Sequence, residues 1–529
     1  MAVADNESAL CIQQLVAYAC KRGLIQTEDL TWCYNALLDM LSYEGPAPVK
    51  PWEKIDLESF DLDQTLAELA RLAVAHGLAE NTQSGEDSFA MRIMGLLLPK
   101  PSEVAHHFNE LYASEGPRAA TDWFYTLCCD AGYVRRSAIA RNITWTTPTT
   151  WGDLEITINL SKPEKDPREI AAAKTAQNTS GEKYPACQLC LDNEGYSGRG
   201  ASSGAGAHPA RQNLRIIPIE LNQHRWGFQY SPYAYFNEHC IAMNSDHIPM
   251  HIDHEALVNL FDFVDRFPHY FIGSNADLPI VGGSILSHDH FQGGRHVFPM
   301  EKATIKERVS FKGFEDVETG IVNWPMSVLR LRGDKDRLIT LADVILQSWI
   351  NYSDESLGIY SHTEGVRHNT VNPVARFKNG KYELDLALRN NRTDTEHPMG
   401  IFHPYEHLHN IKKENIGIIE VMGLAILPGR LKTEMASIKT LLSEAITAGN
   451  AFSTVYTKMN ADSALQKHTQ WLERYVSSCP TPLSIENLDN FINRSIGDTF
   501  CEVLENCGVF KHTPKGEEGF RRFVAQAQV

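Results

Sequence analysis

The sequence predicts a mixed α/β (α+β) fold, with a sheet-forming centre between helical N- and C-terminal regions. Apolar residues recur at helical spacing near both ends of the chain, and with a period of two in its centre. The chain has 529 residues, which exceeds one ordinary core and predicts several packed units.

Residues 1–140 have the pattern of amphipathic helices. Apolar side chains recur at Leu30, Cys33, Leu37 and Leu41, and again at Leu62, Leu66, Leu69 and Ala73. Each set would form one buried stripe. No residue type here suggests chemistry, so we interpret the region as a packing or oligomer-forming unit.

The centre of the chain alternates apolar and polar residues. Leu154, Ile156 and Ile158 alternate with polar neighbours, and "YELDLALRN" places Glu383 and Asp385 opposite an apolar face. This period of two predicts strands. A helix with Leu257, Phe261 and Val264 on one side is expected between them, and helical spacing returns from about residue 431.

The segment "DLPIVGGSILSHDHFQGG", residues 277–294, places His288, His290 and Gln292 at alternate positions after Gly282 and Gly283. If the segment is extended, the three side chains share one face. One imidazole could attack phosphorus while the other orients it, and the amide could hold a phosphoryl oxygen. The pattern therefore indicates a histidine that carries a nucleotidyl group.

The cysteines do not form a disulfide pattern, since there are 11 of them scattered over a long chain. Most are expected to be buried thiols. Cys187 and Cys190 differ, because a two-residue gap lets both sulfurs reach one metal ion.

The overall charge and the hydropathy exclude two classes of partner. A net charge of -17 argues against nucleic-acid binding, which needs an excess of Lys and Arg. No apolar run approaches the ~20 residues of a membrane helix. Asp5 and Glu7 stand where a secretory signal would be basic, so a cytoplasmic protein is expected.

The order His-x-His-x-Gln resembles the active strand of the histidine-triad superfamily, in its nucleotidyl-transferring branch. Together with "YPACQLCLDNEGYSGR", "GDLEITINLSKPEKDP" and "HNIKKENIGIIEVMGLAILP", it resembles the second, mainly bacterial type of galactose-1-phosphate uridylyltransferase over residues 120–529. The resemblance implies a duplicated histidine-triad-like antiparallel sheet core. It divides the chain into a helical region 1–140, a catalytic half 141–300 with a zinc site, a second half 301–430 and a helical region 431–529.

The same resemblance implies a reaction. UMP would pass from UDP-glucose to galactose 1-phosphate, giving UDP-galactose and glucose 1-phosphate in galactose catabolism. His290 would be the nucleophile of a ping-pong mechanism, with Gln292 and the backbone near Gly282 and Gly283 holding phosphoryl oxygens. A homodimer is also implied.

The resemblance also implies a structural zinc ion held by Cys187, Cys190, His247 and His288. His288 has a second interpretation, in which it only orients His290. His239 is a rival third ligand, and His296 could approach the zinc or the phosphates. A second metal of the wider family, described as iron, is not expected here, since "YELDLALRN" contains no His.

Substrate residues are expected around the glycine turn and in three basic positions. Asn275 and Asp277 lie where the family places an Asn that contacts the sugar nucleotide, and Ser284 could donate to a phosphate. Arg211 and Arg215 could bind phosphate as well. Lys412 belongs to a segment that reaches a sugar nucleotide in the family. For each, a solvated surface residue is the alternative.

Two rival functions remain open at this stage. The first is another nucleotidyl-histidine enzyme, such as a dinucleotide phosphorylase, which would use adenosine nucleotides and orthophosphate. The second is a zinc-stabilised interaction module in which the histidines are only ligands.

Overall fold

The computed structural model describes residues 2–43, 51–161, 184–200, 203, 206–283 and 285–527. The chain forms two compact units. Unit 1 contains Met1–Ala140 and Ser161–Ile248, and unit 2 contains Arg141–Leu160 and Pro249–Val529. These boundaries differ from the four ranges expected from the sequence, which remain a prediction.

Unit 1 begins with helices, as the apolar spacing predicted. They are α1 (Ala2–Lys21), α2 (Leu30–Met40), α3 (Leu62–Ala75), α4 (Gln83–Leu96), α5 (Pro101–Glu115), α6 (Pro117–Asp130) and α7 (Arg136–Ala140). Leu30, Cys33 and Leu37 are buried along α2, and Leu66, Leu69 and Ala73 along α3. The helical prediction for residues 1–140 is therefore confirmed.

Three antiparallel strands complete unit 1: β3 (Ile217–Leu221), β4 (His224–Tyr230) and β5 (Cys240–Asn244). Aromatic rings connect them to the helices. Phe108 of α5 and Phe124 of α6 contact Phe228 of β4, with ring centroids 6.3 and 5.8 Å apart. Burying such rings is a large apolar contribution to stability, so this cluster holds the helices to the sheet.

Unit 2 contains the longer sheet. Its strands are β6 (Phe271–Gly273), β7 (His290–Gly294), β8 (Ile305–Val309), β9 (Glu318–Val322), β10 (Val328–Gly333), β13 (Asn369–Lys378) and β14 (Lys381–Asn390). They lie in the order β7-β6-β13-β14-β10-β9-β8, and neighbours are antiparallel. A separate hairpin is formed by β11 (His362–Thr363) and β12 (Val366–Arg367).

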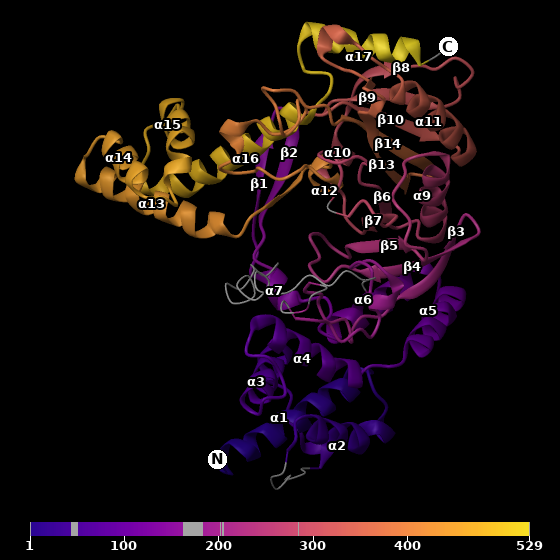
Figure 1. Ribbon diagram of the computed structural model, residues 1–529, viewed down its shortest axis with the longest axis vertical. Helices are drawn as coiled ribbons and strands as arrows, with labels where there is room; N and C mark the ends of the chain where they lie inside the picture. Colours follow the sequence, from indigo (N-terminus) through magenta and orange to yellow (C-terminus); the bar gives the residue numbers. More distant parts are fainter. Residues whose placement is uncertain are drawn as a thin grey trace. The chain divides into compact units, whose positions relative to one another are not determined.

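Helices α9 (His254–Arg266) and α11 (Lys335–Ile350) contact each other and pack on this sheet (Figure 1). Asp253 caps α9 by accepting a hydrogen bond from the Ala256 N–H. Leu257, Phe261 and Val264 are buried on α9, as predicted. The apolar face of α9 therefore covers the strands next to the histidine motif.

The order of elements along the chain occurs twice. A three-strand meander, a helix and two strands occur as β3, β4, β5, α9, β6, β7 and again as β8, β9, β10, α11, β13, β14, with the hairpin β11–β12 inserted before β13. This duplication, the large antiparallel sheet and the flanking helices confirm the fold class predicted from the sequence.

The remaining elements of unit 2 form a small sheet and a helical region. Strands β1 (Ile143–Thr149), β2 (Gly152–Ile158) and β15 (Leu424–Leu427) pair in the order β1-β2-β15. The helices are α10 (Pro299–Lys302), α12 (Ile418–Val421), α13 (Arg430–Ala448), α14 (Ser453–Ala461), α15 (Thr469–Ser477), α16 (Leu488–Cys507) and α17 (Pro514–Gln526). The strand around Leu154 and the helices after residue 431 are confirmed.

Helix α16 lies against β1 at a glycine. A Cβ on Gly497 would lie 2.1 Å from Thr147 Oγ1. No side chain fits at that distance, so close contact between this helix and the small sheet requires glycine.

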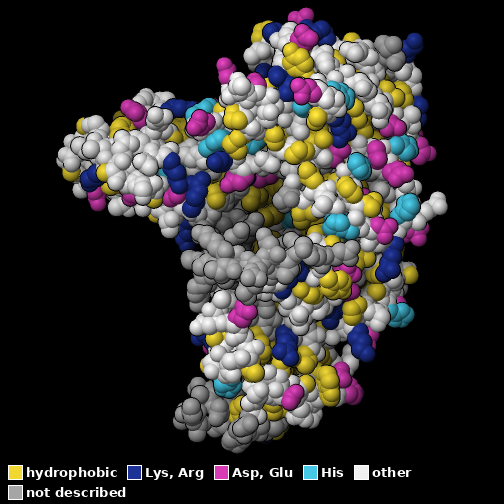
Figure 2. All heavy atoms as spheres, in the orientation of Figure 1, with side chains coloured by type: hydrophobic (Ala, Val, Ile, Leu, Met, Phe, Trp, Pro, Cys, Tyr) yellow, Lys and Arg dark blue, Asp and Glu magenta, His cyan; other side chains and the backbone are white. Residues whose placement is uncertain are grey.

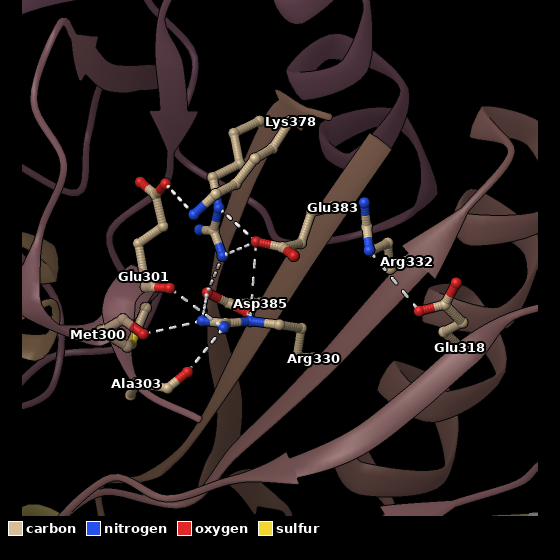
Figure 3. Close-up of polar contacts among 10 residues, drawn as sticks. Met300, Glu301, Ala303, Glu318, Arg330, Arg332, Lys378, Glu383 and Asp385 are labelled. Atoms are coloured by element: carbon tan, nitrogen blue, oxygen red, sulfur yellow. Dashed lines mark hydrogen bonds and ion pairs between the residues drawn. The ribbon is translucent and has the colours of Figure 1, made fainter. Parts of the chain in front are cut away.

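A buried ionic network joins β10, β13 and β14 (Figure 3). The Arg330 guanidinium donates to both Asp385 oxygens at 2.6 and 2.9 Å, and Arg376 donates to Asp385 at 2.7 Å and to Glu383 at 2.6 Å. Burial opposes ionisation, yet the two arginines lower the pKa of Asp385. Both faces of β14 are therefore covered, which the alternating pattern of "YELDLALRN" did not predict.

The same network reaches the segment that follows the histidine strand. Arg330 also donates to the carbonyls of Met300 and Ala303 at 2.8 and 3.1 Å (Figure 3). Lys378 and Glu301 form an ion pair at 2.7 Å. The Met300 carbonyl also accepts from the Ala303 N–H at 3.2 Å, and together these bonds hold the chain leaving β7.

Within the described residues, no helix is both long and apolar enough to cross a membrane. On the face shown in Figure 2, acidic and basic side chains are interspersed in small groups.

Replacing Asp385 by Asn is expected to lower the free energy of unfolding by about 3–5 kcal/mol, because two buried guanidinium groups lose a shared carboxylate. Denaturant titration measures the loss. Lys381→Ala is the control, since Lys381 pairs with Glu318 where both side chains are about half exposed, and its cost should stay below about 1 kcal/mol. Equal losses for the two variants would show that the buried network does not stabilise the fold.

Candidate functional site

Strand β7 carries two of the predicted catalytic side chains. It pairs with β6, and Gly273 lies opposite Gln292. His290 and Gln292 are two residues apart on this strand, so they share a face. His290 is 6% exposed and Gln292 is partly exposed. A Cβ on Gly293 would lie 2.4 Å from the Phe271 carbonyl oxygen, so glycine permits the close pairing of β7 with β6.

The His290 ring is held by its own backbone. Its Nδ1 lies 2.8 Å from the carbonyl oxygen of His288. A carbonyl can only accept, so Nδ1 carries the proton and Nε2 keeps a lone pair. Burial lowers the pKa of His290 to about 4, against the smaller opposing effect of that hydrogen bond. The ring is therefore neutral near pH 7, with Nε2 in the form that attacks an electrophile.

Asn275 and the two glycines lie together before the strand. The Asn275 Oδ1 accepts a hydrogen bond from the Ile418 N–H at 2.9 Å. That contact turns the amide NH₂ the other way, where a Cβ on Gly283 would lie 2.7 Å from Nδ2. A Cβ on Gly282 would lie 2.4 Å from the Ala276 carbonyl oxygen. Both glycines are thus needed for this turn to close around the amide.

Asp277 is anchored within the protein. Its side chain is 1% exposed and pairs with Arg367 at 2.6 Å. It also accepts from the Ile252 N–H at 3.1 Å and the Thr370 hydroxyl at 2.5 Å. Asp277 therefore connects the chain before α9 to the start of β13. Ser284, the predicted phosphate donor, lies outside the described residues.

The predicted basic residues contact protein groups. In unit 1, Arg215 donates to the carbonyls of Pro99 at 2.7 Å and Leu214 at 2.8 Å, and Arg211 donates to that of Ala210 at 3.2 Å. Both arginines are buried, and burial lowers the pKa of Arg215. In unit 2, Lys412 is 4% exposed and forms an ion pair with Glu420 at 2.8 Å. The solvated alternative is wrong for all three.

Three of the proposed metal ligands lie together in unit 1. The sulfurs of Cys187 and Cys190 are 3.7 Å apart, and His247 Nδ1 is 3.2 Å from the Cys190 sulfur. Tetrahedral zinc with Zn–S bonds of about 2.3 Å places two sulfurs about 3.8 Å apart. All three ligand atoms lie within 4.8 Å of one another. Their spacing and chemistry fit zinc.

The backbone around the cysteines favours thiolates. The N–H of Leu189 points at the Cys187 sulfur at 3.3 Å, and that of Cys187 at the Cys190 sulfur at 3.4 Å. The Asn193 amide donates to the carbonyls of both cysteines at 2.8 and 2.9 Å. Burial, together with the neighbouring Cys190 side chain, raises the pKa of Cys187 to about 11, so a bound cation would be needed to ionise that thiol near neutral pH.

The other candidate histidines are His288, His239 and His296. His288 belongs to unit 2, directly before β7, and is 1% exposed. His239 is buried against the Phe236 ring, with centroids 4.5 Å apart. His296 Nε2 lies 2.8 Å from a Glu155 oxygen. Within the part of the chain that the structure describes, neither His239 nor His296 belongs to a cluster of metal-ligand atoms.

Sequence reasoning missed the residues that support Asn275. Ile418 holds the amide through its backbone N–H. Asn372 donates to the Ser274 carbonyl, and Arg389 donates to Asn372. These residues are about 100 or more positions away in sequence and form no motif with it. No local pattern could have identified them.

Comparison with known proteins identifies the family of the chain. The family model for the N-terminal domain of galactose-1-phosphate uridyl transferase matches residues 53–249, and that for its C-terminal domain matches residues 255–448.

Curated relatives match almost the whole chain. Galactose-1-phosphate uridylyltransferase of Clostridium acetobutylicum is 48% identical, covering 97% of this chain and 98% of the relative. That of Caldanaerobacter subterraneus is 47% identical, covering 99% and 98%. That of Bacillus subtilis is 45% identical, covering 97% of both.

Among solved structures, yeast Ap4A phosphorylase Apa2 is 10% identical with a TM-score of 0.30, covering 58% of this chain and 88% of that one. On the family models and the near full-length relatives, the chain belongs to the galactose-1-phosphate uridyl transferase family.

Proposed function

We propose that this chain transfers UMP from UDP-glucose to galactose 1-phosphate through a covalent uridylyl group on His290, as a cytoplasmic homodimer acting in galactose catabolism. One observation carries the mechanism. The buried, neutral His290 ring has its Nδ1 proton held by the His288 carbonyl, so Nε2 is the reacting nitrogen. Family membership supports the choice of substrates.

In the first step, the Nε2 lone pair forms a bond to the α-phosphorus of UDP-glucose. The bond from that phosphorus to the bridging oxygen breaks, and its electron pair leaves with glucose 1-phosphate. The imidazole then carries a positive charge, which the His288 carbonyl stabilises by accepting the Nδ1 hydrogen bond. No proton transfer is needed before attack.

In the second step, a phosphate oxygen of galactose 1-phosphate attacks the same phosphorus. The bond to Nε2 breaks, its electrons return to the ring, and UDP-galactose forms. The Gln292 side chain lies on the same face of β7 as His290, and its amide would donate to the phosphoryl oxygens. Two displacements at one fixed phosphorus keep the reacting atoms positioned throughout.

The substrate residues divide into two groups in this proposal. The Asn275 NH₂, the backbone at Gly282 and Gly283, and Ser284 would contact the sugar nucleotide. Asp277, Arg211, Arg215 and Lys412 would act by holding the surrounding backbone, because their contacts are carbonyls, backbone N–H groups and ion pairs.

We further propose that Cys187, Cys190 and His247 bind a structural zinc ion, with His288 as the fourth ligand. Two thiolates and two imidazoles close the tetrahedral shell, so the ion supplies no activated water. Its effect would be to fix the backbone two residues before His290.

The zinc proposal predicts about one zinc ion per chain in the purified protein, and its loss in Cys190→Ser, because a closed structural site needs all its ligands. Elemental analysis after dialysis measures the content. Cys479→Ser is the matched control, since the Cys479 thiol donates to the Thr481 carbonyl at 3.1 Å and lies far from the cluster in sequence. Zinc retained by Cys190→Ser would refute the assignment.

Replacing His290 by Ala should reduce uridylyl transfer by more than about 1,000-fold, because the covalent route loses its nucleophile. The assay follows UDP-galactose formation, and circular dichroism checks the fold. His254→Ala serves as the control, since that histidine is 57% exposed and pairs with Asp343. Activity preserved in His290→Ala would eliminate the mechanism.

Half-reaction exchange tests the order of steps. With UDP-glucose and labelled glucose 1-phosphate alone, label should enter UDP-glucose, because the first displacement is complete without galactose 1-phosphate. An absolute requirement for galactose 1-phosphate would contradict the covalent route. Exchange with adenosine nucleotides and orthophosphate instead would indicate a dinucleotide phosphorylase.

A further inference from the structure

Arg389, on β14, is a buried cation, and the Glu420 carboxylate acts on it from beyond ion-pair distance. Its side chain is 1% exposed. Within the described residues, no Asp or Glu oxygen forms an ion pair with it, whereas Arg330 and Arg376 of the same sheet share Asp385. Its Nε–H is buried and has no hydrogen-bond partner among those residues. A buried charge of this kind is costly to the fold, which suggests a use beyond packing.

The contacts of Arg389 lead to both sides of Asn275. One Arg389 nitrogen, Nη1, donates to Asn372 Oδ1 at 2.8 Å and to the Ile416 carbonyl at 3.0 Å. Asn372 in turn donates to the Ser274 carbonyl at 3.1 Å. Arg389 therefore joins the residue before Asn275 to the turn at Ile416.

The turn at Ile416 holds the Asn275 side chain. Two residues on, the Ile418 N–H donates to Asn275 Oδ1 at 2.9 Å. Ser274 is fixed as well, since its N–H donates to the Pro373 carbonyl at 3.0 Å and its hydroxyl to the Asn275 carbonyl at 2.9 Å. Arg389 therefore reaches the backbone beside Asn275 through Asn372, and the Asn275 amide through the turn that begins at Ile416.

We propose that Arg389 is a positioning residue for the sugar nucleotide: through Asn372 it holds Ser274, and through the Ile416 carbonyl it holds the Ile416–Ile418 turn, so that the Asn275 NH₂ faces Gly283. This inference rests on the proposed function, since the ligand is UDP-glucose. Without the guanidinium, the Asn372 side-chain oxygen and the Ile416 carbonyl both lose the Nη1 donor that joins them.

A neutral side chain could bridge two carbonyl oxygens less well for two reasons. A Gln side chain has one donor nitrogen, but it also has a carbonyl oxygen. That oxygen would face the Ile416 or Asn372 oxygen, and two acceptors cannot form a hydrogen bond. It also removes the charge. Lysine keeps the charge and the donors without the planar geometry, so Arg389→Lys separates charge from geometry.

The test is a double-mutant cycle on the full-length protein, read as KM for UDP-glucose and as kcat. Arg389→Met and Asn275→Ala are each expected to raise KM by about 10-fold or more. The double variant should be within about twofold of Asn275→Ala alone, because Arg389 acts through Asn275. Arg389→Lys should recover part of the loss.

Multiplied losses in the double variant, or an Arg389→Met enzyme with wild-type KM, would overturn the proposal. If Arg389→Met does not fold, Asn372→Ala breaks the same connection and must show the same non-additivity with Asn275→Ala. Arg332→Met is the control, since Arg332 is partly exposed on β10 near Glu318; its kinetics should be unchanged. Wild-type transfer activity is measured first, so failure of the proposed function is seen separately.

Discussion

The hydrogen bond between His290 Nδ1 and the carbonyl oxygen of His288 decides which nitrogen of the ring can react. At 2.8 Å it fixes both the tautomer and the plane of the ring. The bond is local, because donor and acceptor are two residues apart, yet it depends on the backbone leading into β7 being held. Burial of the ring adds neutrality near pH 7. In the proposed mechanism, these two features would make the ring a nucleophile without a separate base.

The surrounding structure holds that backbone from several sides. Before the strand, Asp277 binds the chain ahead of α9 and the start of β13. After the strand, Arg330 binds the carbonyls at the end of α10. The groups doing this come mainly from the second of the two repeated sets of elements. The first set contains the histidine motif, and the second set supplies contacts that support the backbone around it.

Short-range patterns predicted much of this fold. The periods of α2, α3, α9 and β2 appear in the sequence because each element has one face against a core. The glycines and the alternating histidines were visible for the same reason, since their geometry is local. The strand around Asp385 was found by its alternation, but its second face was not, because its arginine partners lie on other strands.

Burial of charged residues could not be predicted from local sequence. Lys412 was expected either at the substrate or on an exposed turn, and it is buried against Glu420. After Lys413 the chain forms a short helix, Ile418–Val421, and then the strand Leu424–Leu427. Asn372 and Arg389 gave no signal at all. The Lys412–Glu420 pair spans 8 residues and the Asn372–Ser274 contact spans 98, and a repeating pattern of apolar residues reports neither.

The most direct measurement is to mix the protein with UDP-glucose labelled in the uridine, without acceptor, and to map any acid-labile adduct by mass spectrometry and ³¹P–¹⁵N NMR. The account predicts one uridylyl group on His290, bonded through Nε2. An adduct on Nδ1, an adduct on another residue, or no adduct in a protein that catalyses the transfer would contradict it.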